Sequence, residues 1–175
     1  VAMSTHDTSG VIAHLEATPR DLAGCFTYSS YEAALQTTTA VVDRFGLRGL
    51  STKSFSRTSS KAEMRRHLTD AGLPVPASQT TTDPDQLDAF RTRHGAVVVK
   101  PSQGSFGAAG VALLDESTSN APELLAEACR LSSDGVAIVE QFLDGTEYSV
   151  DGFVMDGEVC VLAASRKYVL GPQQH

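Results

Sequence analysis

Residues 96–110 read Ala-Val-Val-Val-Lys-Pro-Ser-Gln-Gly-Ser-Phe-Gly-Ala-Ala-Gly, and they decide the fold. Three β-branched residues in a row, between Gly95 and Pro101, predict a buried strand that ends on Lys100. The loop that follows is rich in small residues, and its glycines let the backbone approach a ligand and present N–H groups to it. A lysine on a rigid strand that faces such a loop suits a chain of phosphates.

The order of these parts differs from three common phosphate-binding designs. In a P-loop and in a protein kinase the glycines precede the lysine. In the Rossmann fingerprint the glycines open a helix, whereas residues 111–114 (Val-Ala-Leu-Leu) predict a second strand. What remains is a strand, a lysine, a glycine-rich hairpin and a strand. A surface β-hairpin with a chance lysine is the alternative that this stretch alone leaves open.

Length and charge narrow the class of protein. A chain of 175 residues suits one ordinary domain or two small ones, because domains have about 100 to 150 residues. An apolar content of 41% with 20% charged residues is ordinary for a globular protein. The net charge of −7 argues against a general surface for nucleic acid or for an acidic membrane, and it leaves room for a local basic pocket.

The cysteines and histidines show no metal or disulfide pattern. Cys25, Cys129 and Cys160 are widely spaced, and none of the five histidines pairs with a cysteine at ligand spacing. No run approaches the roughly 20 apolar residues of a membrane helix, and no leader segment is visible. We therefore expect a cytoplasmic protein with no metal ligand among its residues.

Periodicity and capping signals predict an α+β chain that is not a parallel doubly wound sheet. Residues 47–60 are expected to be a connector, and residues 10–17 a strand, with a helix not excluded. Asp156-Gly157 is a strong signal for a two-residue hairpin turn. The expected helices cover residues 31–45, 60–71, 83–94 and 120–131, and the expected strands cover residues 96–100, 111–114, 136–140, 148–155 and 158–164.

A second group of candidate functional residues follows the expected helix 120–131. From residue 139 the chain reads Val-Glu-Gln-Phe-Leu-Asp-Gly-Thr-Glu, which places Glu140 at a strand end, an apolar pair next and Glu147 after a turn. A purine needs an apolar slot, an acceptor for its exocyclic amine and backbone groups along its edge, and this connector offers all three. A further carboxylate can accept from two ribose hydroxyls. A surface hairpin with solvated carboxylates is the alternative.

Three blocks in order carry a resemblance to a known family. They are Ser-Lys-Ala-Glu-Met-Arg-Arg-His-Leu with Ala-Gly-Leu-Pro-Val-Pro (60–76), Val-Val-Val-Lys-Pro with the glycine loop (97–111), and Val-Glu-Gln-Phe-Leu-Asp-Gly-Thr-Glu-Tyr-Ser-Val-Asp-Gly (139–152). From Lys61 to about Lys167 the chain resembles the ATP-grasp superfamily, the fold of biotin carboxylase, D-alanine:D-alanine ligase and many carboxylate-amine ligases. Residues 31–50 look like the last helix and strand of the pre-ATP-grasp domain.

The resemblance implies a role for each matching position. Lys61 and Lys100 would bind the ATP phosphates, and the loop 102–110 would close over them as a lid. Glu140 would accept from the adenine amine, while Lys167 resembles a basic position that faces the phosphates. The other implied ATP-binding residues are Gly104, Ser105, Phe106 and Gly107 in the lid, Gln141, Phe142 and Leu143 as the backbone hinge, and Glu147 at the ribose.

The resemblance also implies a domain plan and a reaction. Residues 1–55 would be a remnant and linker of an α/β pre-ATP-grasp domain, and residues 56–175 the nucleotide-gripping part, an antiparallel sheet with helices. The expected chemistry is ATP-dependent ligation of a carboxylate to an amine or thiol through an acyl phosphate. The expected partners are small-molecule substrates, and the expected cofactors are ATP and Mg²⁺. The residues that bind Mg²⁺ are expected to lie outside this chain, in a metal-binding lobe. Alone the chain would be inactive, and a homodimer is compatible with the resemblance.

Two alternatives belong to other functional classes. One is a non-catalytic nucleotide-binding module, and the other is a fragment of an ATP-grasp carboxylase or kinase. All these hypotheses depend on one geometric expectation, that Lys100 and Glu140 share a cleft and reach opposite ends of one nucleotide.

Overall fold

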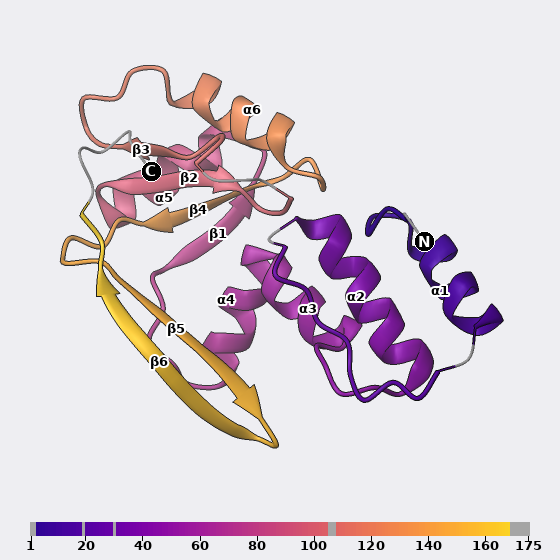
Figure 1. Ribbon diagram of the computed structural model, residues 1–175. Helices are drawn as coiled ribbons and strands as arrows, with labels where there is room; N and C mark the ends of the chain where they lie inside the picture. The colour runs from indigo at the N-terminus through magenta and orange to yellow at the C-terminus, as the bar shows by residue number, and fades with distance from the viewer. Residues whose placement is uncertain (1–2, 19, 30, 105–107, 169–175) are drawn as a thin grey trace. The chain divides into compact units, whose positions relative to one another are not determined.

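A computed structural model of the chain describes residues 3–18, 20–29, 31–104 and 108–168. Its contacts form two units, Val1–Val75 with Ser102–Gly104, and Pro76–Pro101 with Ser105–His175. Figure 1 labels the elements of both units. The predicted domain boundary after residue 55 stays a prediction.

The first unit consists of helices that pack one after another. They are α1 (Thr8–Ala17), α2 (Glu32–Phe45), α3 (Thr52–Ser59) and α4 (Lys61–Asp70). Residues Ala34, Val41 and Val42 of α2 are buried. Gly46 ends α2 in the left-handed conformation (φ 62°), as the sequence predicted. A single parallel bridge joins Gly24 to Arg48 on either side of α2.

Two expectations for the first unit differ from the structure. Residues 8–17 form a helix, which the sequence left open as the alternative to a strand, and the side chain of Asp7 caps it by accepting from the backbone N–H of Gly10 at 2.9 Å. The expected connector 47–60 contains α3, which Ser51 caps by accepting from the N–H of Ser54 at 3.1 Å. Phe55 fixes α3 because its ring is 8% exposed.

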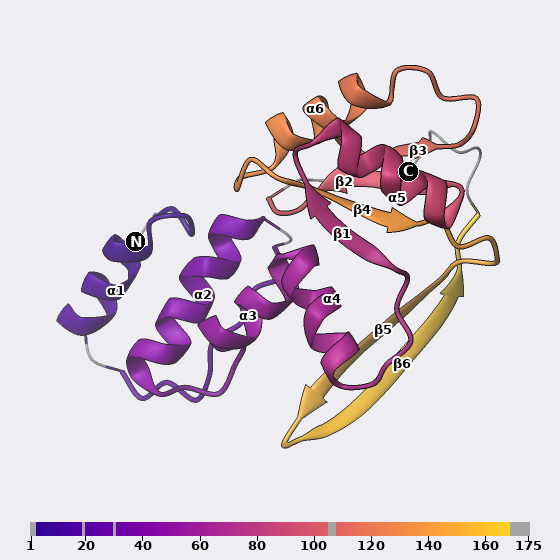
Figure 2. The same cartoon turned by 180° about the vertical axis from the view of Figure 1, so that it is seen from behind.

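The second unit is built on a four-stranded antiparallel sheet in the order β1-β4-β2-β3 (Figures 1 and 2). Its strands are β1 (Ser78–Thr81), β2 (Val97–Pro101), β3 (Ala112–Leu114) and β4 (Ala137–Gln141). The sequence predicted β2, β3 and β4, and the observed ends of each strand lie within one residue of the expected ends. The sequence did not predict β1, whose four polar residues form an edge strand with little apolar signal.

Helices α5 (Pro84–His94) and α6 (Ala121–Leu131) cover one face of this sheet. The start of α5 agrees with the prediction, since Asp83 accepts from the N–H of Asp85 at 2.9 Å. Gln86, placed by the sequence in a capping box, uses its side-chain oxygen to accept from the hydroxyl of Thr81 at 3.0 Å. The shared core contains Leu87, Phe90, Val97, Val99, Leu114, Ala121, Leu125, Ala128, Ala137 and Val139.

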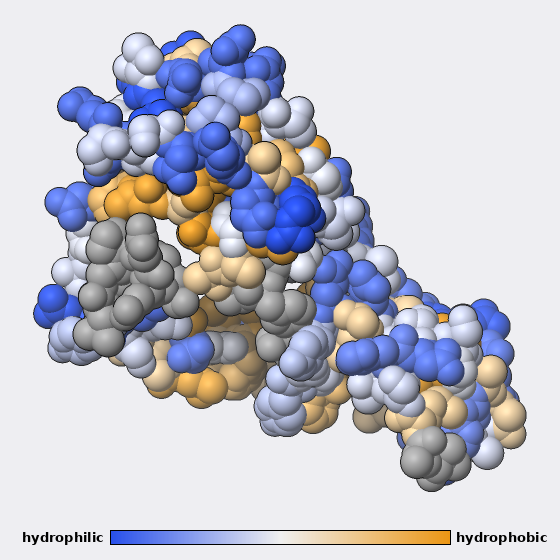
Figure 3. All heavy atoms as spheres, turned by 90° about the horizontal axis from the view of Figure 1, so that it is seen from above, coloured by the Kyte–Doolittle hydropathy of each residue, from blue (hydrophilic) through white to orange (hydrophobic). Residues whose placement is uncertain are grey.

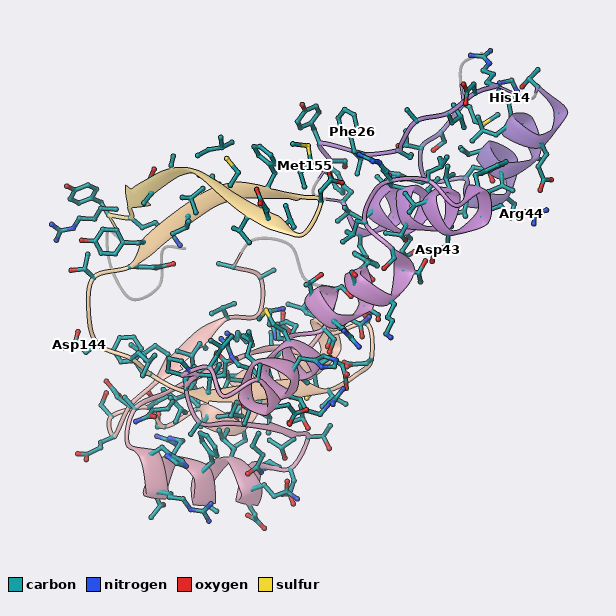
Figure 4. All side chains as sticks on the ribbon, turned by 90° about the horizontal axis from the view of Figure 1, so that it is seen from below. His14, Phe26, Asp43, Arg44, Asp144 and Met155 are labelled. Atoms are coloured by element: carbon teal, nitrogen blue, oxygen red, sulfur yellow. The ribbon has the colours of Figure 1, made fainter. Side chains whose placement is uncertain are left out.

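A two-stranded hairpin, β5 (Tyr148–Met155) and β6 (Glu158–Arg166), follows the sheet in the chain. Its turn residues Asp156 and Gly157 both have positive φ (52° and 85°), as a type I′ turn requires. Every residue of both strands is exposed. Figure 4 shows side chains on both faces of the ribbon, with Met155 at its far end and Asp144 on the connection from β4.

The α+β fold is therefore as predicted, an antiparallel sheet with helices. Hydrophobic residues, orange in Figure 3, are visible at the surface among hydrophilic ones. None of the described helices combines the length and the apolar character needed to cross a bilayer.

Candidate functional site

Alternation along β2 and β4 sorts their side chains onto two faces. Val97, Val99 and Val139 point into the core and are 0% exposed. Because successive side chains of a strand point to opposite faces, Lys100 and Glu140 lie together on the other face. The register pairs Val98 with Glu140, and Lys100 with Ile138, so the lysine and the glutamate are diagonal neighbours across two paired strands.

Lys100 and Glu140 form an ion pair on that face. The Nζ atom of Lys100 donates to Oε2 of Glu140 at 2.6 Å. The side chain of Lys100 is 19% exposed and that of Glu140 is 6% exposed, so most of the pair is removed from water. Such a pair is held tightly, because separating the two charges in a site with little water is energetically costly.

This contact bears on one expectation. The sequence predicted that the two residues share a cleft and reach opposite ends of one nucleotide. The structure places both on one face of the sheet and in direct contact, and their contacts with a nucleotide stay a prediction. The physical reason is the stem of lysine, whose four carbons span the diagonal from β2 to β4. Groups of a ligand that bind both residues must accordingly be close neighbours.

The predicted hinge 141–143 leaves the sheet directly after Glu140. The N–H of Gln141 donates to the carbonyl of Ala77 at 2.9 Å, and the N–H of Phe142 donates to the carbonyl of Ala96 at 2.9 Å. Sheet hydrogen bonds therefore use two of the three hinge amides. The side chains of Phe142 and Leu143 are 41% and 62% exposed, which leaves an apolar pair open at the strand end.

Glu147 and Lys167, which the resemblance gave separate roles, lie together at the open end of the hairpin. The Nζ atom of Lys167 donates to Oε1 of Glu147, and the backbone N–H of Lys167 donates to the carbonyl of Glu147 at 2.9 Å. Both side chains are about half exposed (48% for Glu147 and 47% for Lys167). This pair extends the register of Tyr148 with Arg166 by one residue on each strand.

Lys61 begins α4 directly after its cap. Ser60 accepts from the N–H of Glu63 at 3.3 Å, as the sequence predicted. The backbone N–H of Lys61 donates to the carbonyl of Ser102 at 3.0 Å, which ties the start of α4 to the first residue of the glycine loop. Ser102 is 1% exposed.

The glycine loop itself is described in part. Gly104 has a φ of 75° and Gly110 a φ of 71°, so both adopt a conformation that favours glycine. A Cβ on Gly110 would come within 3.0 Å of Pro101 and Leu131. The predicted lid residues Ser105, Phe106 and Gly107 lie outside the described residues.

Sequence reasoning missed two neighbours of the site. Ser102 anchors Lys61 through its carbonyl, a contact between backbone atoms that leaves no signal in the side chains. Ser78 of the unpredicted strand β1 is paired in register with Glu140. Its exposed hydroxyl belongs to the face of the sheet that carries the ion pair.

Among residues 3–18, 20–29, 31–104 and 108–168, no three His, Cys, Asp or Glu side chains gather as metal ligands. The functional groups that the structure brings together are two pairs of opposite charge and one exposed apolar segment. This donor set suits a ligand that carries an anion, an N–H donor and a flat apolar face.

Comparison with known proteins identifies a family of similar sequences. Residues 58–174 match the family model of the ATP-grasp domain. A glutathione biosynthesis bifunctional protein of Streptococcus thermophilus is 30% identical over 120 residues, which are 67% of this chain and 16% of that protein. The chain spans about a third or less of the curated relatives that it matches.

Solved structures share the fold at lower identity. An L-amino acid ligase from Bacillus licheniformis aligns with a TM-score of 0.72 and 23% identity, over 94% of this chain and 37% of that chain. An N5-carboxyaminoimidazole synthetase from Staphylococcus aureus, complexed with ADP, aligns with a TM-score of 0.72 and 12% identity, over 99% of this chain and 44% of that chain.

Proposed function

Because this chain belongs to the ATP-grasp domain family, we propose that it is the ATP-binding part of a ligase that joins a carboxylate to an amine or a thiol. The observation that carries the proposal is the contact of 2.6 Å between Lys100 and Glu140 on one face of the sheet. A cation beside a carboxylate offers a donor and an acceptor side by side. The base of an adenine nucleotide can use both, because its exocyclic amine is a donor that lies beside a ring nitrogen acceptor.

The remaining predicted residues have roles that fit this proposal. Since the amides of Gln141 and Phe142 already donate within the sheet, the amide of Leu143 is our candidate donor to the edge of the base. Glu147 would accept from the ribose hydroxyls. Lys61 and Lys167 would add positive charge for the phosphates.

The proposed reaction has two steps. A carboxylate oxygen of the substrate attacks the γ-phosphorus of ATP, the bond to ADP breaks, and an acyl phosphate forms. The amine or thiol then attacks the acyl carbon, phosphate leaves with the electron pair, and a proton leaves the nucleophile. Placing positive charge where negative charge develops accounts for much of the rate in such reactions. In this chain lysines would supply that charge.

Titration calorimetry with ATP on the full chain tests the binding role. We expect Lys100→Ala to weaken ATP binding by about 1 to 3 kcal/mol, the scale of a charge-assisted hydrogen bond. The matched control is Lys53→Ala, because Lys53 is an exposed lysine of α3. Unchanged ATP affinity in Lys100→Ala, with an unchanged circular dichroism spectrum, would refute the assignment.

A second measurement separates a ligase from a binding module. The chain is incubated with ATP, candidate carboxylates and hydroxylamine, which traps an acyl phosphate as a hydroxamate. Hydroxamate formed in step with ADP supports the ligase. ATP binding without hydroxamate is expected both of a non-catalytic module and of a ligase part that is tested without its metal-binding lobe, so only hydroxamate formation separates the two.

A further inference from the structure

Arg166 and Lys167 are neighbouring cations at the open end of the hairpin, and they belong to its opposite faces. The register pairs Arg166 with Tyr148, and the N–H of Lys167 continues the ladder by donating to the carbonyl of Glu147. Successive side chains of a strand point to opposite faces, so the two cations are separated. The ammonium of Lys167 donates to Glu147, whereas no carboxylate among the described residues forms an ion pair with Arg166.

Aromatic rings accompany the guanidinium of Arg166. Its Cζ atom lies 5.3 Å from the centre of the Tyr168 ring, and Tyr148 is its direct neighbour across the two strands. Both tyrosines are exposed. A ring orients a guanidinium through cation–π attraction and uses none of its N–H groups. Arg166 is therefore an oriented cation whose planar set of donors faces solvent.

The face that carries Arg166 is otherwise apolar. It consists of every second residue of β5, starting at Tyr148, together with their register partners on β6. Within residues 148–155 and 158–166, all of which the structure describes, Arg166 is the one charged residue of this face, because Asp151 and Glu158 belong to the other. We call it the arginine face. Its residues, all exposed, are Tyr148, Val150, Gly152, Val154, Val159, Val161, Ala164 and Arg166.

An apolar face with a cation at one end is complementary to an amphipathic anion. An apolar body gains free energy when it covers the exposed valines. The planar fork of a guanidinium matches the two oxygens of a carboxylate and can donate to both at once. Inorganic phosphate carries charge but nothing that could cover the valines. The arginine face therefore favours a carboxylate with an apolar body.

We propose that the arginine face is a ligand site for a carboxylic acid that carries an apolar body. Arg166 binds the carboxylate, the valines contact the apolar body, and Tyr168 is a positioning residue that orients the guanidinium. This site lies on the face of the hairpin opposite to Lys167 and Glu147. It therefore goes beyond the proposed nucleotide site, and its binding does not require ATP.

The first test compares an acid with its amide on the unaltered full chain, so it does not depend on the folding of a variant. The probes are 4-phenylbutyrate and 4-phenylbutanamide, titrated at pH 7 in a calorimeter. They share the apolar body and differ in charge. We expect the acid to bind at least tenfold more tightly than the amide, since only the acid forms charge-assisted hydrogen bonds. Equal affinities, or no binding of the acid, would overturn the proposal.

Two smaller anions test the apolar part of the site. Acetate carries the carboxylate without the body, and inorganic phosphate is an anion of another class. Both are expected to bind at least tenfold more weakly than 4-phenylbutyrate, because neither covers the valines. Phosphate binding as tight as that of 4-phenylbutyrate would indicate a general anion site and would contradict the assignment to carboxylates.

Variants then locate the site. Arg166→Gln should weaken 4-phenylbutyrate about tenfold and leave the amide unchanged. The matched control is Arg93→Gln, which removes a positive charge from an exposed position of α5 and should change neither affinity. An acid affinity that Arg166→Gln leaves intact, with an unchanged circular dichroism spectrum, would place the site elsewhere and refute the inference.

Tyr168 has a test of its own. Tyr168→Leu removes the ring and should weaken the acid about threefold while the amide is unaffected, because the ring acts through the guanidinium. Tyr168→Phe keeps the ring and should restore the acid affinity. A purely structural role would weaken acid and amide together, and that result would remove Tyr168 from the site.

Sedimentation velocity tests a second copy of the chain as the occupant. If the chain forms a dimer that Val159→Ser dissociates, the arginine face is an interface between copies and the proposal is wrong. A monomer that binds 4-phenylbutyrate through Arg166 supports it. This result is independent of the proposed function, since a chain that binds 4-phenylbutyrate but not ATP retains this site and loses the nucleotide site.

Discussion

The four-stranded sheet and the β5–β6 hairpin use the same kind of strand in opposite surroundings. In the sheet, Val97, Val99 and Val139 are 0% exposed beneath α5 and α6. In the hairpin all residues are exposed, including eight large apolar ones: Tyr148, Val150, Phe153, Val154, Met155, Val159, Val161 and Leu162. Pairing of strands is common to both, so burial by helices is what distinguishes a stable sheet from a marginal ribbon.

Each region also carries one ion pair of predicted site residues. Lys100 with Glu140 is largely buried in the sheet, whereas Lys167 with Glu147 is half exposed at the hairpin end. A buried pair is costly to break from one side, and an exposed pair contributes little. A lysine–glutamate pair therefore contributes more to the free energy of unfolding in the sheet than at the end of the hairpin.

The largest expected difference between the regions concerns a phenylalanine in each. Phe90→Ala, in the core under the sheet, should lower the free energy of unfolding by about 3 to 5 kcal/mol, because it leaves a cavity. Phe153→Ala in the hairpin, where the ring is 45% exposed, should lower it by less than about 1 kcal/mol. Urea denaturation followed by circular dichroism measures both, and equal losses would contradict the comparison.

The two lysines come next. Lys100→Ala should lower the free energy of unfolding by about 3 kcal/mol, since it removes the ammonium that lies 2.6 Å from the largely buried carboxylate of Glu140. Lys167→Ala, at the exposed pair, should change it by about 0 to 1 kcal/mol. The same denaturation experiment applies. A loss at Lys167 as large as that at Lys100 would show that the hairpin end is buried in solution.

A binding measurement tests the hairpin end. Glu147→Ala should weaken ATP by about 1 kcal/mol, and should weaken an analogue that lacks both ribose hydroxyls much less. The difference arises because only ATP offers the hydroxyls to the carboxylate. Calorimetry with the two ligands measures it, and equal losses would remove Glu147 from the ribose role.

The smallest expected effect is a pH dependence in the loop after β3. The side-chain hydroxyl and the N–H of Ser117 donate to the carboxylate of Asp115, and so does the hydroxyl of Thr118, which together lower the pKa of Asp115. A carboxyl whose pKa is lower in the folded state stabilises the fold above its unfolded pKa of about 3.9, and this stability is lost as the pH falls through the folded pKa.

The variant Asp115→Asn isolates this contribution. At pH 6 it should unfold at lower urea than the unaltered chain, and the gap should narrow toward pH 3. Glu116→Gln, a neighbouring exposed residue in the same loop, is the control and should show no such narrowing. A gap that stays constant between pH 6 and pH 3 would remove Asp115 from the pH dependence.

Sequence reasoning located most elements whose signals are local. Ser60 and Asp83 cap their helices as predicted, and Asp156-Gly157 turns the hairpin, because each signal acts within four residues. It missed α3 and β1, whose sequences are rich in serine, threonine and glutamine. These two elements depend on tertiary contacts, namely the burial of Phe55 and the pairing of β1 with the distant strand β4.

By itself, the sequence determined which residues are candidates for a functional role and which family the chain resembles, because motifs are local strings of residue types. Only the tertiary structure decided which of those residues meet. Lys100 and Glu140 are 40 positions apart, and Glu147 and Lys167 are 20 apart. Their contacts follow from strand register, which is set by the sum of many packing interactions and so cannot be read from either residue and its neighbours.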